Sequence, residues 1–297
     1  MTFSKETGVK AAGRQVHNML RTLNNFQQRF LATLFSICAA GLIIFSSHFS
    51  PFQLLFVAVI AAVQARALWE YYGLCLIKGL EPNRLLSIVF SIFYVLCHYF
   101  SPDFPLSESL CLLLALSFMV HLSQHEQAIG NLATTFFGFA YITLPLSLLI
   151  DLNFSAHNSS LWIIYLIATT KIADIAAYIV GKTVGRTPLA RKLSPKKTVE
   201  GAIAGLVAAA LMSLLFCNGT STLSIAPYFS LGQAAVLGLA IGFVSQIGDL
   251  AESLLKRDAG VKDSSNIPGF GGILDMVDSV IFTAPLLYFW LTIKGVL

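Results

Sequence analysis

Long apolar runs separated by short polar stretches dominate this sequence. The runs are long enough for a helix to cross a hydrocarbon core of about 30 Å, whereas a closed barrel needs strictly alternating segments of roughly 10 residues. We therefore predict an all-α integral membrane protein with about nine transmembrane helices. The predicted helices are Phe30–Ser46, Phe52–Leu74, Leu85–Phe100, Leu106–Val120, Ile129–Ile150, Leu161–Val180, Ala202–Phe216, Ala234–Leu250 and Val277–Ile293.

The composition agrees with this pattern. Of 297 residues, 56% are apolar and 11% are charged, and the mean hydropathy is +0.75. These values exclude an ordinary soluble domain and make the lipid bilayer the expected surroundings of the chain. We expect no nucleic-acid partner, and a homodimer is left open.

The positive charges predict an orientation. Lys and Arg cluster before Phe30 and in Arg66–Arg84, Lys182–Lys197 and Lys256–Lys262, all on one side of the nine-helix arrangement. The loops on the other side contain neither residue. Because inserting chains keep Lys and Arg in the cytoplasm, we expect a multi-pass protein of the cell (inner) membrane with a cytoplasmic N-terminus.

Two regions follow from this arrangement. Residues 1–29 form a basic leader, which is either an amphipathic helix on an anionic membrane surface or a partly disordered tail. Residues 30–297 form one polytopic domain. Within it, the pairs Gly201/Gly205 and Gly238/Gly242 have the spacing that lets membrane helices approach closely.

Charged residues inside the predicted helices are the first candidates for chemistry. Lys171 and Asp174 are three residues apart and therefore share a helix face. Asp249 lies near the cytoplasmic end of its predicted helix. Charge within a membrane is costly and usually marks function, although Lys171 and Asp174 also suit a structural ion pair.

A second candidate is the basic loop Gly185–Gly201. Ser194 and Pro195 are expected to start a turn, and Lys196, Lys197 and Thr198 precede a helix. Ammonium groups, a hydroxyl and free helix amides all favour a bound phosphate. The alternative is a loop that only sets the orientation of the chain.

The third candidate is the signature segment Ser253–Ser279, SLLKRDAGVKDSSNIPGFGGILDMVDS, which holds seven charged residues. Asp275 and Asp278 stand three residues apart where the last helix begins, and two like charges on one face favour a cation between them. Carboxylate oxygens with open positions for water and phosphate suit Mg²⁺. Capping of the helix by two acids is the alternative.

These motifs resemble one family. SPKKTVEG (Ser194–Gly201), KIADIAAYIVGKTVGR (Lys171–Arg186), ALWEYYGL (Ala67–Leu74) and the signature segment are similar to sequences of the phosphatidate cytidylyltransferases, or CDP-diacylglycerol synthases. The resemblance implies a membrane enzyme that joins CTP to phosphatidate in the presence of Mg²⁺, at a cleft on the cytoplasmic side.

The resemblance also implies roles for particular residues. It places Asp249, Asp275 and Asp278 at the metal site and, with Lys256, in catalysis. Lys171 and Asp174 support that site. The residues expected to bind nucleotide and phosphate are Ser194, Lys196, Lys197, Thr198, Ser253, Lys256, Arg257, Lys262 and Asp263.

The sequence departs from the family pattern in three ways and leaves other functions open. Phe270 stands where His is expected, Met276 stands where Arg is expected, and the segment Ser265–Phe270 is one residue shorter than expected. An inactive paralogue is therefore one alternative. A CTP-dependent polyprenol or phytol kinase would use similar lysines and carboxylates, and a secondary transporter could use Lys171, Asp174 and Asp249 as an ion pathway.

Overall fold

The structure is a computed structural model that describes residues 52–101, 104–122, 127–154, 159–222, 230–262, 264 and 272–297, together with Gly41 and Ser46. The predicted leader and nearly all of the first predicted helix lie outside these residues. The described chain is mainly helical. Its helices are α3 (Gln53–Ile77), α4 (Arg84–Phe100), α5 (Leu106–His121), α6 (Ala128–Gly138), the π-helical η2 (Phe139–Thr143), α7 (Leu144–Phe154), α8 (Ser159–Thr183), α9 (Val199–Thr222), α10 (Leu231–Asp258) and α11 (Ile273–Ile293).

Every predicted helix that falls within the described residues coincides with a helix of the structure. Six helices are long and apolar enough to cross a membrane: α3, the continuous α6–η2–α7, α8, α9, α10 and α11. The other two, α4 and α5, have only 17 and 16 residues. The chain is therefore a multi-pass membrane protein, and the count of nine transmembrane helices stays a prediction.

The all-α prediction is wrong at one place. Between α8 and α9, strands β1 (Pro188–Ala190) and β2 (Ser194–Thr198) form an antiparallel hairpin. The turn comes at residues 191–193, before the Ser194-Pro195 pair that was expected to start it. Glu200 of α9 accepts hydrogen bonds from the backbone N–H groups of Arg186 and Thr187, and so closes the base of the hairpin.

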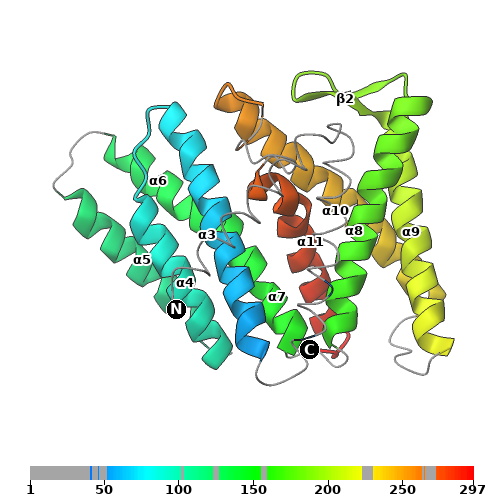
Figure 1. Ribbon diagram of the computed structural model, residues 1–297, viewed down its shortest axis with the longest axis horizontal. Coiled ribbons are helices and arrows are strands. Elements are labelled where there is room, and N and C mark those ends of the chain that lie inside the picture. Colours follow the sequence, from blue (N-terminus) through cyan, green and yellow to red (C-terminus); the bar gives the residue numbers. More distant parts are fainter. Residues whose placement is uncertain are drawn as a thin grey trace, which may run out of the picture.

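Helices α8, α9, α10 and α11 pack in succession, and α3 and α7 complete the bundle around α11 (Figure 1). Two close contacts confirm the role predicted for the glycine pairs. A Cβ atom at Gly201 would lie 2.6 Å from the carbonyl oxygen of Ala177 on α8. A Cβ atom at Gly238 would lie 2.6 Å from Cβ of Ser213 on α9. The absence of side chains at these positions therefore lets neighbouring backbones touch.

The largest hydrophobic cluster joins α3, η2, α7, α8, α10 and α11, and its fully buried members include Leu68, Tyr72, Tyr165 and Leu237. This cluster fixes how α10 and α11 lie against α3 and α8. The hairpin, the C-terminal end of α10 and the start of α11 all lie in the upper half of Figure 1. The motifs singled out from the sequence therefore gather at one end of the bundle.

Candidate active site

A cavity of about 700 Å³, which we call the polar pocket, lies between α8, α9, α10 and the hairpin. It brings together the basic loop and two of the charged positions from separate predicted helices. Its polar side chains are Asp174, Tyr178, Lys182, Lys196, Lys197, Thr198, Gln246 and Asp249. A volume of several hundred Å³ is typical of sites for small molecules and cofactors, so the polar pocket is the candidate nucleotide site.

Within the polar pocket, the hairpin is joined to α10 by an ion pair. The Lys197 ammonium lies 2.5 Å from a carboxylate oxygen of Asp249. Both side chains are partly exposed, but the Lys197 Nζ atom itself is buried, so a phosphate group would have to displace Asp249 to reach it. Lys196, the neighbouring lysine, is exposed.

Thr198 has a structural role at the start of α9. Its hydroxyl accepts a hydrogen bond of 3.1 Å from the backbone N–H of Gly201, which satisfies one of the free amides of the first turn. With Glu200 holding the backbone before the hairpin, these contacts fix the direction in which Lys196 and Lys197 leave the strand.

Lys171 and Asp174 share a helix face, as their spacing predicts, and form the structural ion pair given as the alternative, with 3.6 Å between the ammonium and carboxylate atoms. The pair also contacts the next helices. Lys171 Nζ donates to the carbonyl oxygen of Met276 on α11 at 3.4 Å, and Asp174 accepts from the hydroxyl of Ser245 on α10 at 3.2 Å. The pair therefore ties α8 to both helices that carry the signature segment.

Both carboxylate oxygens of Asp275 have partners within the protein. Its Oδ1 atom lies 2.7 Å from Lys256 Nζ, and its Oδ2 atom accepts a 2.9 Å hydrogen bond from the backbone N–H of Gly272. Lys256 also lies 2.5 Å from the buried carboxylate of Glu252. One lysine thus bridges two carboxylates and holds the start of α11 against α10, while the hydrogen bond to Gly272 is the helix capping that the alternative expected of Asp275.

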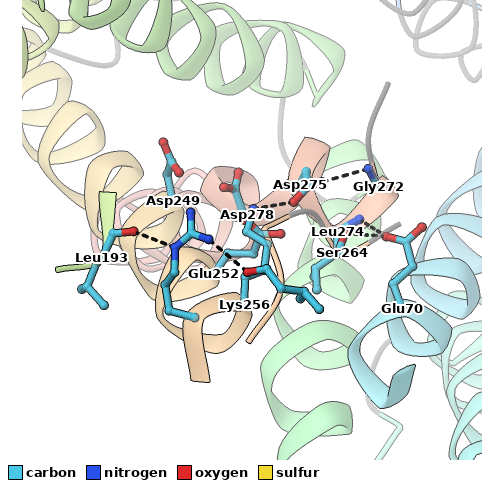
Figure 2. Close-up of polar contacts among 12 residues, drawn as sticks. Glu70, Leu193, Asp249, Glu252, Lys256, Ser264, Gly272, Leu274, Asp275 and Asp278 are labelled. Carbon is cyan, nitrogen blue, oxygen red and sulfur yellow. Dashed lines mark hydrogen bonds and ion pairs between the residues drawn. The ribbon is translucent and has the colours of Figure 1, made fainter. Parts of the chain in front are cut away.

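Asp278 is brought next to Asp249 by close packing of α10 on α11. A Cβ atom at Gly248 would lie 2.6 Å from the carbonyl oxygen of Asp278. The Asp278 side chain is 5% exposed and accepts a hydrogen bond from the Ser279 N–H at 2.5 Å. Figure 2 shows the Asp249 and Asp278 carboxylates pointing to the same side of the two helices, within electrostatic reach of each other.

The other residues of the signature segment lie around this centre. Arg257 donates to the carbonyl oxygens of Leu193 at 3.2 Å and Val261 at 3.0 Å, which joins the hairpin turn to the end of α10. Ser253 is buried and Lys262 is exposed. Ser194 is in strand β2 opposite Ala190. Asp263 lies outside the described residues.

Two buried acids near the site were missed by the sequence reasoning. One is Glu252. The other is Glu70 on α3, which accepts hydrogen bonds from the Leu274 N–H at 2.9 Å and the Ser264 hydroxyl at 3.1 Å (Figure 2). Glu70 thereby joins α3 to Ser264 and to the first turn of α11. The sequence signal that could have identified Glu70 was its charge inside the otherwise apolar motif ALWEYYGL.

The carboxylates provide a test of the magnesium prediction. In the part of the chain that the structure describes, no three His, Cys, Asp or Glu side chains are grouped to hold a metal ion. Asp275 is paired with Lys256 and Asp249 with Lys197, so a cation at the neighbouring carboxylates of Asp249 and Asp278 would have to displace Lys197. Mg²⁺ is commonly held by one or two carboxylates together with phosphate oxygens and water. The pair fits a magnesium–nucleotide complex, and a site with three carboxylates stays a prediction.

The packing at Gly248 predicts a sensitivity to added volume. We expect Gly248→Ala to force α10 and α11 apart, to lower stability by about 1–3 kcal/mol and to reduce turnover as Asp249 moves away from Asp278. Thermal unfolding in detergent and an activity assay would measure both effects. Gly73→Ala on α3 is the control, because a Cβ atom there meets no other atom within 4 Å. Equal behaviour of the two variants would contradict the close packing.

Comparison with known proteins places these features in context. Residues 27–294 match the model of the cytidylyltransferase family. A phosphatidate cytidylyltransferase of Synechocystis sp. is 36% identical over 270 residues, which are 80% of this chain and 88% of the relative. A protein of the same name from Chlamydia pneumoniae is 37% identical over 166 residues, 54% of each chain. Phosphatidate cytidylyltransferase 4, chloroplastic, of Arabidopsis thaliana is 35% identical over 256 residues, 74% of this chain and 62% of the relative.

Proposed function

Because this chain belongs to the cytidylyltransferase family, we propose that it transfers the cytidylyl group of CTP to phosphatidate, giving CDP-diacylglycerol and pyrophosphate. The observation that carries the proposal is the match to a relative named phosphatidate cytidylyltransferase over most of both chains. The polar pocket adds a second support, since it joins lysines to carboxylates at one end of a membrane-spanning bundle.

The reaction needs little proton transfer. The phosphate of phosphatidate is a monoester with a second pKa of about 6, so the attacking oxygen is already ionised near neutral pH. That oxygen forms a bond to the α-phosphorus of CTP while the bond from the α-phosphorus to the bridging oxygen breaks, and pyrophosphate leaves with the electron pair. A general base is unnecessary, which agrees with Phe270 in place of the expected His.

Positioning and charge neutralisation are then the main tasks of the protein. Lys196 and Lys197 bind phosphate oxygens of CTP in the polar pocket, and Lys197 exchanges its contact with Asp249 for one with the nucleotide. Asp249 and Asp278 would hold Mg²⁺, with Asp275 as the further ligand predicted from the sequence. When bound, the ion neutralises the triphosphate and stabilises the departing pyrophosphate.

The remaining site residues support this arrangement. Lys256 and Arg257 hold the start of α11 and the hairpin turn, and with Ser253, Lys262 and Asp263 they form the proposed signature for nucleotide and phosphate. Ser194 and Thr198 complete the hairpin element. Lys171 and Asp174 keep α8 in contact with α10 and α11.

The substrates also support an orientation. The acyl chains of phosphatidate stay in the bilayer and CTP comes from the cytosol, so we propose a cytoplasmic-side cleft reached sideways from lipid. The distribution of Lys and Arg supports nine transmembrane helices, a cytoplasmic N-terminus and, in a bacterium, the inner membrane. A homodimer stays a prediction.

Product analysis tests the proposal. Purified protein in detergent, given Mg²⁺, CTP and phosphatidate, is expected to form CDP-diacylglycerol and pyrophosphate in equal amounts, detected by mass spectrometry and a coupled pyrophosphate assay. Omitting phosphatidate is the control and should abolish pyrophosphate release. If well-folded protein formed neither product, that result would contradict the proposal.

A further inference from the structure

Tyr141 lies in the π-helical turn η2, in the middle of the membrane-spanning segment α6–η2–α7. Turns of this kind are rare and occur frequently at functional sites. The turn is held by polar side chains of α3 and α4. Gln64 donates to the carbonyl oxygen of Thr143 at 3.2 Å, and Ser91 links the Gln64 side chain to the Thr143 hydroxyl. Two neighbouring helices therefore stabilise the irregular backbone that presents Tyr141.

The Tyr141 ring is fixed by other aromatic rings. It stacks on Phe137 with 5.5 Å between ring centroids, and it meets Phe282 of α11 edge to face with 6.1 Å between centroids. The Tyr141 hydroxyl is buried, yet it has no hydrogen-bond partner among the described residues. Buried tyrosine hydroxyl groups usually have a partner, so this donor is available to a ligand.

The surroundings of the hydroxyl point to the reacting centre. Tyr141 is within electrostatic reach of Asp278 and Glu252. Phe282, which touches its ring, lies one helical turn beyond Asp278 on α11. The polar pocket, in contrast, is lined by residues of α8, α9, α10 and the hairpin. Tyr141 therefore approaches Asp278 from α3 and α6–η2–α7, the side away from the polar pocket.

The same side leads to the bilayer. Phe137 packs directly on Tyr141, and it is 50% exposed in a segment that is long and apolar enough to span a membrane. The ring stacked on Tyr141 therefore lies on the outer surface of the bundle. In a transfer at phosphorus, the attacking and leaving oxygens lie roughly in line, on opposite sides of the reacting atom. With the nucleotide in the polar pocket, the acceptor must come from the opposite side.

We propose that the Tyr141 hydroxyl donates a hydrogen bond to the phosphate of the lipid acceptor and positions it for attack from the side of α3 and α6–η2–α7. The inference rests on the proposed function and adds to it the binding side of the lipid. Because an ionised phosphate oxygen accepts a stronger hydrogen bond than the neutral oxygens of diacylglycerol, this donor also favours the phosphate-bearing lipid.

The test is Tyr141→Phe, which keeps the ring contacts and removes the hydroxyl. A hydrogen bond to a charged group contributes enough that we expect the KM for phosphatidate to rise by about tenfold, with the KM for CTP changed less than about twofold. Tyr99→Phe is the matched control. Its hydroxyl donates to Gln53 at 3.1 Å on another part of the bundle, so both KM values should be unchanged.

A binding measurement separates this inference from the proposed function. Titration of short-chain phosphatidate and diacylglycerol into the purified protein should show preference for phosphatidate in the natural chain and its loss in Tyr141→Phe. If the natural chain shows that pattern without forming CDP-diacylglycerol, the proposed function fails and the role of Tyr141 stands. Unchanged preference for phosphatidate in Tyr141→Phe, or equal rises of both KM values, would overturn the role.

Discussion

The Asp278→Asn variant is expected to lose at least about a hundredfold of kcat while folding as well as the natural chain. The carboxylate is 5% exposed, lies beside Asp249 and forms no ion pair among the described residues, so its charge is available to a bound cation. Asparagine keeps the size of the side chain and an oxygen that accepts from the Ser279 N–H. Removing a charge from a membrane-spanning helix is not expected to lower stability.

Two measurements on the same preparation check this prediction. Turnover should fall, while size-exclusion chromatography shows a monodisperse protein with an unchanged or higher melting temperature. Asp258→Asn is the control, because Asp258 forms only an exposed pair with Lys78 at 3.2 Å. An Asp278→Asn protein with full activity would remove Asp278 from the reaction.

The Lys256→Met variant is expected to be the most destabilising substitution at the site. Lys256 Nζ lies 2.5 Å from Glu252 and 2.7 Å from Asp275, and Glu252 is only 1% exposed. Methionine would leave two neighbouring carboxylates without their cation. Breaking a buried ion pair in this way costs about 3–5 kcal/mol, so thermal unfolding in detergent should occur several degrees lower and turnover should fall with it.

A second substitution shows whether Lys256 is more than a structural bridge. Lys256→Met/Glu252→Gln removes the unpaired buried charge and should recover much of the stability, but turnover should stay low if the ammonium also binds phosphate. If both stability and turnover recovered, the role of Lys256 would be limited to holding α11 in place. Lys78→Met is the control, since its pair with Asp258 is exposed and should contribute less than about 1 kcal/mol.

Much of the fold could be predicted because apolar runs report directly on membrane helices. The hairpin Pro188–Thr198 could not, because its short strands are held by Glu200 and not by an apolar pattern. The π-helical turn at Phe139–Thr143 is likewise stabilised by Gln64, a residue 79 positions away. Such contacts depend on tertiary packing and leave no local signal.

The site was predictable to a similar extent. Spacing alone predicted that Lys171 and Asp174 share a helix face, where the structure shows the ion pair that was the alternative to a functional role. Spacing could not show that Asp275 is taken by Lys256 or that Lys197 meets Asp249, because these partners come from different elements. Glu70 reaches Leu274 across 204 residues, a distance at which sequence order gives no information about contact.

The position of the phosphorus transferred from CTP tests the central claim most directly. Purified protein is given phosphatidate, Mg²⁺ and CTP labelled at either the α- or the γ-phosphate, and lipid and aqueous products are separated. Cytidylyl transfer predicts α label in the lipid and γ label in pyrophosphate. The γ label in the lipid would contradict the account and show a kinase instead.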